Sequence, residues 1–161
     1  MGQRVVSSVE LHRQDIQYAA LPWRKLGNTL QILLITTRNT RRWIIPKGWP
    51  VVGCSPSECA AHEALEEAGI MGHVSMKALG SFHYDKRRKS GDVIRCEVFV
   101  FPMEVLHRRR TWAEKTVRET RWCLVEEALM HVSEPELRRL IAKFAKGSRG
   151  VQRAAHMPAI A

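Results

Sequence analysis

Three glutamates stand at a spacing that suits a metal ion. Glu63, Glu66 and Glu67 lie three and four residues apart within the segment from Ser55 to Gly69. That segment opens with Ser-Pro-Ser-Glu, a capping-box pattern with proline at the first helical position, and its glycine supplies a stop signal. At about 100° per residue, a helix places the three carboxylates within one turn. The sequence therefore predicts a helix with an acidic cluster on one face.

Such a cluster has two interpretations. Like charges at these spacings repel by a few tenths of a kcal/mol per pair, so the cluster either is a solvated acidic face or serves a purpose. The second interpretation is a site for a hard divalent cation, because Mg²⁺ prefers carboxylate oxygens and shares its shell with substrate phosphates. Ala61, Ala64, Leu65 and Ala68 form a small apolar face on the other side of the helix. We expect that face to pack against a sheet.

The residues before the helix favour the metal site. The segment Trp-Ile-Ile-Pro-Lys-Gly ends at Gly48 and leads through a short loop into the helix. Here the sequence resembles the Nudix hydrolase family, whose motif reads G-x5-E-x7-R-E-U-x-E-E-x-G-U, with U a bulky apolar residue. The positions that match the motif in register are Gly48, Glu63, Glu66, Glu67, Gly69 and Ile70.

The likeness extends from about Ala19 to Phe144. Over that range the chain is similar to the diphosphoinositol polyphosphate and diadenosine polyphosphate hydrolase branch of the family. The residues that carry this likeness are Arg42-Trp43, the basic turn Lys86 to Lys89, Trp112, Arg118, Arg121-Trp122 and Val125 to Ala128.

The resemblance implies a pyrophosphohydrolase that uses Mg²⁺, or Mn²⁺ in its place, to cut a phosphoanhydride with water. It implies that Glu63 and Glu67 hold the metal and that Glu66 is the general base or a further ligand. Glu114 is an alternative base. Arginine forks match phosphate oxygens in pairs. By position, the expected substrate-binding residues are Arg38, Arg42, Lys47, Gly48, Trp49, Lys86 and Arg118. Trp49 either stacks on a base of the substrate or packs against the protein.

Three functions remain open at this point. The first is hydrolysis of a small polyphosphorylated substrate such as a diadenosine polyphosphate or a diphosphoinositol polyphosphate. The second is removal of pyrophosphate from an RNA 5′ end, which a formal net charge of +10 also suits. No RNA-binding motif with interleaved aromatic residues supports it. The third is a catalytically impaired module that binds phosphate without cutting.

Two motif positions depart from the family. Cys54 stands where the family has its first Glu, and His62 stands where it has Arg. In the family these two residues often pair, so their joint replacement avoids a stranded charge. One interpretation is a neutral Cys54–His62 contact in a working enzyme. The others are a degenerate site and, given the hard carboxylates beside it, a less plausible softer-metal site.

Composition indicates a globular chain of 161 residues with 45% hydrophobic residues. No apolar run is long enough to span a bilayer, and the N-terminus lacks a secretory signal, so we expect a cytoplasmic protein without a membrane partner. The four cysteines have no zinc-site spacing and are expected to be free thiols. The predicted domains are an N-terminal extension (1–14), a Nudix hydrolase domain (15–146) and a flexible basic tail (147–161). The oligomeric state is open.

The elements that position the motif are strands and two helices. Leu30 to Thr37, Trp43 to Ile45 and Val93 to Val105 read as strands, and His73 to Tyr84 is a weaker strand. In the long strand, the face that carries Arg95, Glu97, Phe99 and Phe101 is expected to form a pocket wall. A second capping box from Ser133 to Glu136 predicts a C-terminal helix that ends at Gly147. The predicted fold is therefore a Nudix-type α/β/α sandwich with a mixed β-sheet, a catalytic strand-loop-helix and a C-terminal helix.

Overall fold

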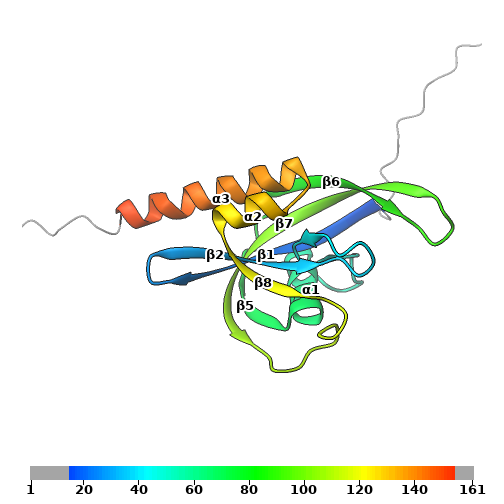
Figure 1. Ribbon diagram of the computed structural model, residues 1–161, viewed down its shortest axis with the longest axis horizontal. Coiled ribbons are helices and arrows are strands. Elements are labelled where there is room, and N and C mark those ends of the chain that lie inside the picture. Colours follow the sequence, from blue (N-terminus) through cyan, green and yellow to red (C-terminus); the bar gives the residue numbers. More distant parts are fainter. Residues whose placement is uncertain (1–14, 155–161) are drawn as a thin grey trace, which may run out of the picture.

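The computed structural model describes residues 15–154 of the chain (Figure 1). At the centre of this part lies a mixed sheet of eight strands. The five strands of the main path lie in the order β3-β2-β1-β7-β5, with β4 on β1, β6 on β7 and β8 on β2. Strands β1 and β7 pair in parallel, and the other pairs of described strands are antiparallel. The strands are β1 Ile16–Leu26, β2 Thr29–Thr36, β3 Trp43–Ile44, β4 Lys47–Gly48, β5 Ile70–Val74, β6 Gly80–Arg87, β7 Val93–Arg108 and β8 Thr120–Leu124.

Helices cover both faces of this sheet. Helix α1 (Pro56–Ala68) lies on one side, and α2 (Val125–His131) and α3 (Pro135–Ala154) lie on the other (Figure 1). The consequence is visible in β2, where the consecutive residues Ile32, Leu33, Leu34 and Ile35 are all fully buried. Consecutive burial requires both faces of a strand to be covered. The predicted α/β/α sandwich with a mixed sheet and a C-terminal helix is confirmed.

Helix α1 begins and ends where its sequence predicts. The Ser55 hydroxyl accepts the backbone N–H of Glu58 at 3.3 Å, and the Glu58 carboxylate accepts the backbone N–H of Ser55 at 2.7 Å. Gly69 takes the left-handed conformation at φ 68° and closes the last turn. A side chain at Gly69 would also overlap the Trp112 ring. Glycine is therefore required here both for the turn and for the packing of the following loop.

The strand predictions hold for the apolar runs and fail elsewhere. The runs at residues 30–37, 43–45 and 93–105 correspond to β2, β3 and β7. The single strand predicted from His73 to Tyr84 is wrong, because two strands, β5 and β6, occupy that region with a bend between them.

The last helix begins at Pro135, inside the predicted segment from Ser133 to Glu136, but its predicted end is wrong. The Glu136 carboxylate accepts hydrogen bonds from the backbone N–H of His83 and lies 3.3 Å from its ring nitrogen, so it braces β6 instead of closing a capping box. The helix also continues through Gly147 to Ala154. A glycine inside a helix costs only about 1 kcal/mol relative to alanine, which the rest of the helix can offset. The part of the predicted tail from 155 to 161, like residues 1–14, lies outside the described residues.

Candidate active site

The acidic face of α1 meets the sheet instead of pointing away from it. The buried residues of the helix include Cys59, Ala60, Ala64 and Ala68 together with Glu67. Glu63 is partly buried, and Glu66 is exposed. The apolar face packs as expected at Ala64 and Ala68, but the acidic face is not separate from the packed one, since Glu67 is buried with it. Because the packed arc extends to Glu67, the carboxylates stand at the edge of the helix–sheet contact, where they wall a cleft.

Gly48 of β4 leaves the space that the Glu63 carboxylate occupies. The Glu63 carboxylate lies directly over the glycine, at a position that a Cβ on residue 48 would overlap. Strand β4 itself is fixed by antiparallel pairing with β1, in which Gly48 faces Tyr18. The first glycine of the motif is thus required by the close approach of a carboxylate from the catalytic helix.

Both oxygens of Glu67 accept hydrogen bonds. The backbone N–H of Lys47 donates to one oxygen at 3.1 Å, and the Arg118 guanidinium donates to the other at 2.5 Å. The side chains of Glu67 and Arg118 are only 8% and 11% exposed, so this is a buried ion pair. Burial raises the pKa of Glu67, and Arg118 and the Lys47 amide oppose that shift.

Arg118 bridges three parts of the site. Besides Glu67, its guanidinium donates to the Glu114 carboxylate at 2.7 Å and to the Thr36 carbonyl at 2.9 Å. Glu114 also forms an ion pair with Arg38, and its backbone N–H donates to the Glu66 carbonyl at 3.0 Å. The loop from 109 to 119 is therefore attached to the end of α1 and to the end of β2.

A second network fixes Lys47 on the opposite wall. The ammonium group of Lys47 lies 3.1 Å from the Tyr84 hydroxyl, which donates to the buried Gln17 side chain at 2.7 Å. Burial lowers the pKa of Lys47 to about 8, although Glu67 favours its charged form. Desolvation likewise raises the pKa of the Tyr84 hydroxyl. The cation is held rigidly at the point where β4 turns toward the cleft.

These side chains line one cleft of about 460 Å³. Its lining carries four carboxylates and four cations in addition to Gly48 and Trp49. The carboxylates are Glu63, Glu66, Glu67 and Glu114, and the cations are Arg38, Lys47, Lys86 and Arg118. The lining therefore offers carboxylate oxygens that a divalent cation could use and cationic groups that phosphate oxygens could use.

The pKa of Glu63 is raised by its burial and by the negative charges of its neighbours. Burial, followed by the charges of Glu67 and Glu66, raises its pKa to about 7. A divalent cation between these carboxylates would relieve the repulsion. Within residues 15–154 no three His, Cys, Asp or Glu side chains converge as a ready-made metal site. The hard oxygen donors still fit Mg²⁺, because each oxygen of Glu67 keeps a lone pair beyond the hydrogen bond that it accepts.

Some residues predicted from the motif lie away from the cleft. Arg42 forms an ion pair with Glu134 at 3.2 Å and does not line it. The interpretation of a neutral contact between Cys54 and His62 would suggest a hydrogen bond, but none joins them in the part of the chain that the structure describes. Cys54 lies beside Cys59 and Glu58, and His62 interacts with Glu58. All four cysteines are free thiols.

The face of β7 that was predicted to form a pocket wall does not line the cleft, although Phe99 and Phe101 pack against Tyr18, which lines the cavity beside it. Arg95, Glu97, Phe99 and Phe101 line neither this cleft nor the cavity beside it. The opposite face approaches the site instead, because Cys96 lies beside Tyr84 and Lys47. Gln17 and Tyr84, which complete the Lys47 network, carry no motif in the sequence. Only the pairing of β1, β6 and β7 brings them together.

Comparison with known proteins decides the family. The NUDIX domain model matches residues 19–144, which is most of the chain and includes every residue of the cleft apart from Gln17. The chain belongs to the Nudix family. In this Nudix chain the glycine, the three glutamates and the loop of Arg118 are assembled around one cleft, as described above.

Several curated proteins are similar in sequence to this chain over part of their own length. Nudix hydrolase 13, mitochondrial, of Arabidopsis thaliana is 35% identical over 109 residues, covering 63% of this chain and 53% of the relative. Diphosphoinositol polyphosphate phosphohydrolase 3-beta of Bos taurus is 28% identical, covering 69% of this chain and 65% of the relative. The chain spans 53% to 59% of the length of three of the plant relatives.

Solved structures agree on the fold. A binary complex of the C. elegans Ap4A hydrolase superposes with a TM-score of 0.63 at 20% identity, covering 84% of this chain and 98% of that chain. At that identity the likeness shows the fold alone. None of the helices within residues 15–154 has the length and apolarity of a membrane span.

Proposed function

We propose that the chain is a Mg²⁺-dependent pyrophosphohydrolase that cuts a phosphoanhydride in a small polyphosphorylated substrate. The observation that supports this most is the cleft in which Glu63, Glu66 and Glu67 face Lys47 and Lys86. Diadenosine polyphosphates and diphosphoinositol polyphosphates are the candidate substrates, since relatives and structural neighbours carry those names. Nudix hydrolases generally use divalent metal ions. Mn²⁺ is the alternative cofactor here.

Each wall of the cleft has its own task. Glu63 and Glu67 would hold the metal, which would supply charge neutralisation and a more acidic water. Lys47 and Lys86 bind phosphate oxygens on the opposite wall. Glu66 is the most exposed of the three carboxylates, so it is the one free to accept a proton from the attacking water. Glu114 is less suited to that task, because Arg38 and Arg118 both hold its carboxylate.

A substrate panel tests this proposal. The panel contains diadenosine tetraphosphate, ADP-ribose, a diphosphoinositol polyphosphate and 5′-triphosphate RNA, each assayed with and without Mg²⁺. We expect cleavage of at least one small substrate with Mg²⁺ and a fall of about 100-fold in Glu66→Gln, the scale for removing one catalytic group. If no member were cleaved by a folded protein in Mg²⁺ or Mn²⁺, the site would bind phosphate without cutting it.

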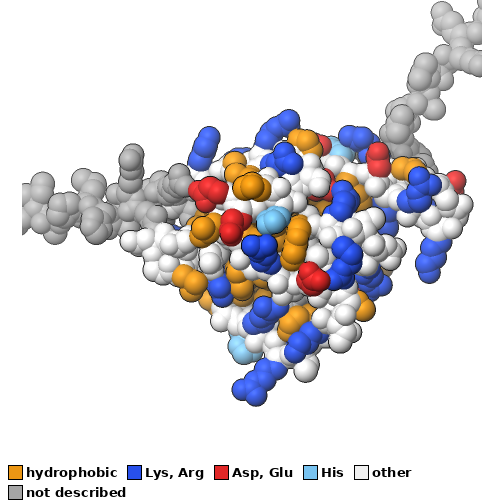
Figure 2. Space-filling view, in the orientation of Figure 1, with side chains coloured by type: hydrophobic (Ala, Val, Ile, Leu, Met, Phe, Trp, Pro, Cys, Tyr) orange, Lys and Arg blue, Asp and Glu red, His pale blue; other side chains and the backbone are white. Residues whose placement is uncertain are grey.

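RNA is the second candidate substrate. Lys and Arg side chains are spread over the face of the molecule in Figure 2, without one stripe that would follow a nucleic acid backbone. On this face, the distribution gives no support to a track for a nucleic acid backbone. A salt titration separates the two, because RNA affinity falls along a steep log–log slope with salt and a compact ligand responds less.

Location and assembly stay as predictions. Several plant relatives carry the word mitochondrial in their names, so the cytoplasmic location expected from the sequence has no support from them. The oligomeric state is open.

A further inference from the structure

Two of the four cysteines stand at positions that meet across the first turn of α1. Ser55 is the N-cap of this helix, and Glu58 is its third residue. Cys54 therefore precedes the cap, and Cys59 is the fourth residue of the helix. Side chains at these two positions pack together in the hydrophobic staple that often accompanies a capping box. In this chain both members of the staple are thiols.

The structure brings these two thiols into contact. The Cys59 thiol lies 3.9 Å from the Cys54 carbonyl oxygen, and its sulfur accepts the backbone N–H of Val51 at 3.4 Å. Burial raises the pKa of the Cys54 thiol, and so do the neighbouring Cys59 and Glu58 and a hydrogen bond between the two thiols. The pair therefore lies within reach of a disulfide bond without rearrangement of the fold.

The two thiols differ in exposure in the way that a two-step exchange requires. Cys54 is partly exposed, whereas Cys59 is buried. A disulfide in solution reaches Cys54 first, and Cys59 beside it then resolves the mixed disulfide. The raised pKa of Cys54 makes the first step slow near neutral pH, because the thiolate is the nucleophile. Cys96 and Cys123 are fully buried on β7 and β8, which shields them from the same reagent.

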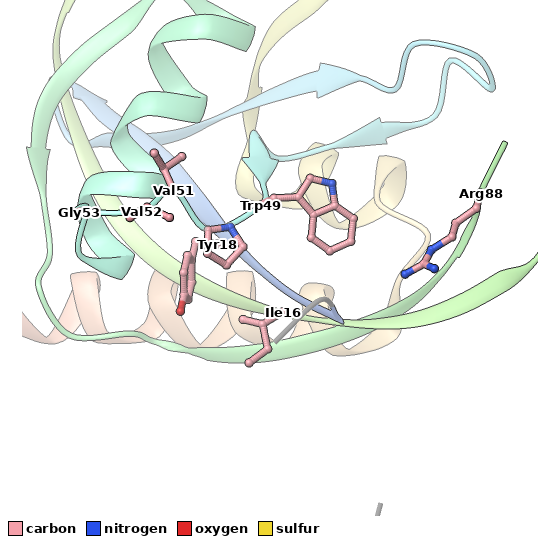
Figure 3. Close-up of a pocket in the computed structure, with 8 residues that line it drawn as sticks. Ile16, Tyr18, Trp49, Val51, Val52, Gly53 and Arg88 are labelled. Carbon is pink, nitrogen blue, oxygen red and sulfur yellow. The ribbon is translucent and has the colours of Figure 1, made fainter. Parts of the chain in front are cut away.

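Both thiols are tied to Val51, which lines the cleft. The Cys59 sulfur holds the Val51 N–H, and the backbone N–H of Cys54 donates to the Val51 carbonyl at 3.1 Å. Gly53, at φ 84°, lies in that turn, on the loop that leads from β4 into α1 (Figure 3). A disulfide bond is only about 2 Å long, so at least one of the two sulfurs must move when it forms. Whichever moves, a hydrogen bond of Val51 changes with it.

We propose that Cys54 and Cys59 are a site of reversible disulfide formation by low-molecular-weight disulfides such as oxidised glutathione, and that the bond slows hydrolysis in the cleft. The Cys54 thiolate attacks the reagent, forms a mixed disulfide and releases one glutathione thiolate. The Cys59 thiolate then attacks the Cys54 sulfur and releases the second. Two protein thiols thus lose two electrons and two protons to one glutathione disulfide, which becomes two molecules of glutathione. In a reducing compartment such bonds are transient and serve redox sensing.

Peptide mapping of the wild type tests the bond itself. The segment 48–77 follows Lys47, ends at Lys77 and has no other lysine or arginine, so trypsin releases both cysteines of the pair in one peptide. The protein is treated with oxidised glutathione at about pH 8, where more of the thiol is ionised, and the remaining thiols are blocked in denaturant. We expect this peptide to lose the mass of two hydrogen atoms and to carry no blocking group. The peptides of Cys96 and Cys123 should both be blocked, and dithiothreitol should restore the pair.

Hydrolysis of a small polyphosphorylated substrate tests the consequence, which rests on the proposed function. We expect oxidation to lower the wild-type rate roughly threefold or more, because the cleft wall at Val51 shifts, and dithiothreitol to restore it. Cys54→Ser should keep the reduced rate and lose the response, whereas the control Cys123→Ala should keep the response.

A pair that is fully blocked after oxidation, or a glutathione adduct on Cys54 that Cys59 never displaces, would overturn the proposed site. An oxidised wild type with an unchanged rate would overturn the proposed slowing of hydrolysis, as would an equal response in Cys54→Ser. The map needs no variant, so it decides the site even where a substitution prevents folding. A disulfide in a protein that hydrolyses no substrate would support the site and contradict the proposed activity, so the two failures are distinguishable.

Discussion

The Arg118 guanidinium donates to the Glu67 carboxylate at 2.5 Å, in an ion pair that is almost fully buried. Glu67 comes from the catalytic helix and Arg118 from a loop 51 residues later in the chain. The same guanidinium holds Glu114 and the Thr36 carbonyl. Arg118 was expected to bind substrate, yet its donors point at the protein. We propose that it positions the glutamates.

Removal of that arginine should therefore destabilise the fold. Arg118→Ala leaves the buried Glu67 carboxylate without its cation, and breaking a buried pair from one side costs about 3–5 kcal/mol. We expect a loss of that size in the free energy of unfolding, measured by urea denaturation. The matched control is Arg95→Ala, because Arg95 pairs with Asp85 at the surface, where both side chains are more than 60% exposed. There the loss should stay below about 1 kcal/mol. Equal effects of the two variants would show that the Arg118 pair has no special role.

Glu63 should make the stability of the metal-free protein depend on pH. Its pKa is raised from 4.5 to about 7. The folded state therefore binds more protons than the unfolded state between these values, so the protein loses stability as pH rises through this window. At 1.36 kcal/mol per pKa unit the loss is at most about 3 kcal/mol, and because Glu63 is partly exposed, solvent screening reduces it to about 1–2 kcal/mol at pH 8. In thermal unfolding with a chelator, Glu63→Gln should raise the Tm at pH 8 and change it little at pH 4. A lower Tm for the variant at both pH values would contradict this account.

Gly48 should tolerate no side chain. In Gly48→Ala the new Cβ overlaps the Glu63 carboxylate, which must move away from the cleft. We expect hydrolysis to fall by about 100-fold with the fold retained, as judged by circular dichroism. The control is Gly147→Ala, which meets no neighbouring atom inside α3. It should raise stability by up to about 1 kcal/mol and leave activity unchanged. Full activity in Gly48→Ala would show that the position of Glu63 is unimportant.

The effects of Cys54 and His62, the two departures from the family motif, on the Tm and on hydrolysis should be separable. Cys54 lies beside Glu58, so Cys54→Glu alone adds a like charge that Glu58 repels and the positive N-terminal end of α1 attracts, and it should change the Tm little. His62 also interacts with Glu58, so His62→Arg in the same chain adds a cation beside this carboxylate and should raise the Tm. We expect the double variant to turn over substrate at least as fast as the wild type. Loss of hydrolysis in a folded double variant would mean that Cys54 and His62 have a catalytic role of their own.

The sequence predicted those parts of the site whose residues lie close together in the chain. The capping box, the three glutamates and the closing Gly69 lie within one short segment, so spacing alone places the glutamates on one helix between these two ends. Strand β1 was not predicted, because Ala19, Ala20 and Pro22 are poor strand formers, yet it pairs with β2, β4 and β7. The Arg118 bridge and the Lys47–Tyr84–Gln17 network join segments far apart in the chain. No pattern of spacing reveals such contacts before the sheet is assembled.

The dependence of hydrolysis on the metal and on Glu67 tests the central claim most directly. The rate of phosphoanhydride cleavage is measured across a Mg²⁺ titration for the wild type and for Glu67→Gln, in which the amide oxygen still accepts from Arg118. We predict a saturable rise in the wild type, its abolition by a chelator, and a rate at least 100-fold lower in the folded variant. A wild-type rate that ignores the chelator, or a variant rate within threefold of the wild type, would contradict the assignment of these glutamates to a catalytic metal.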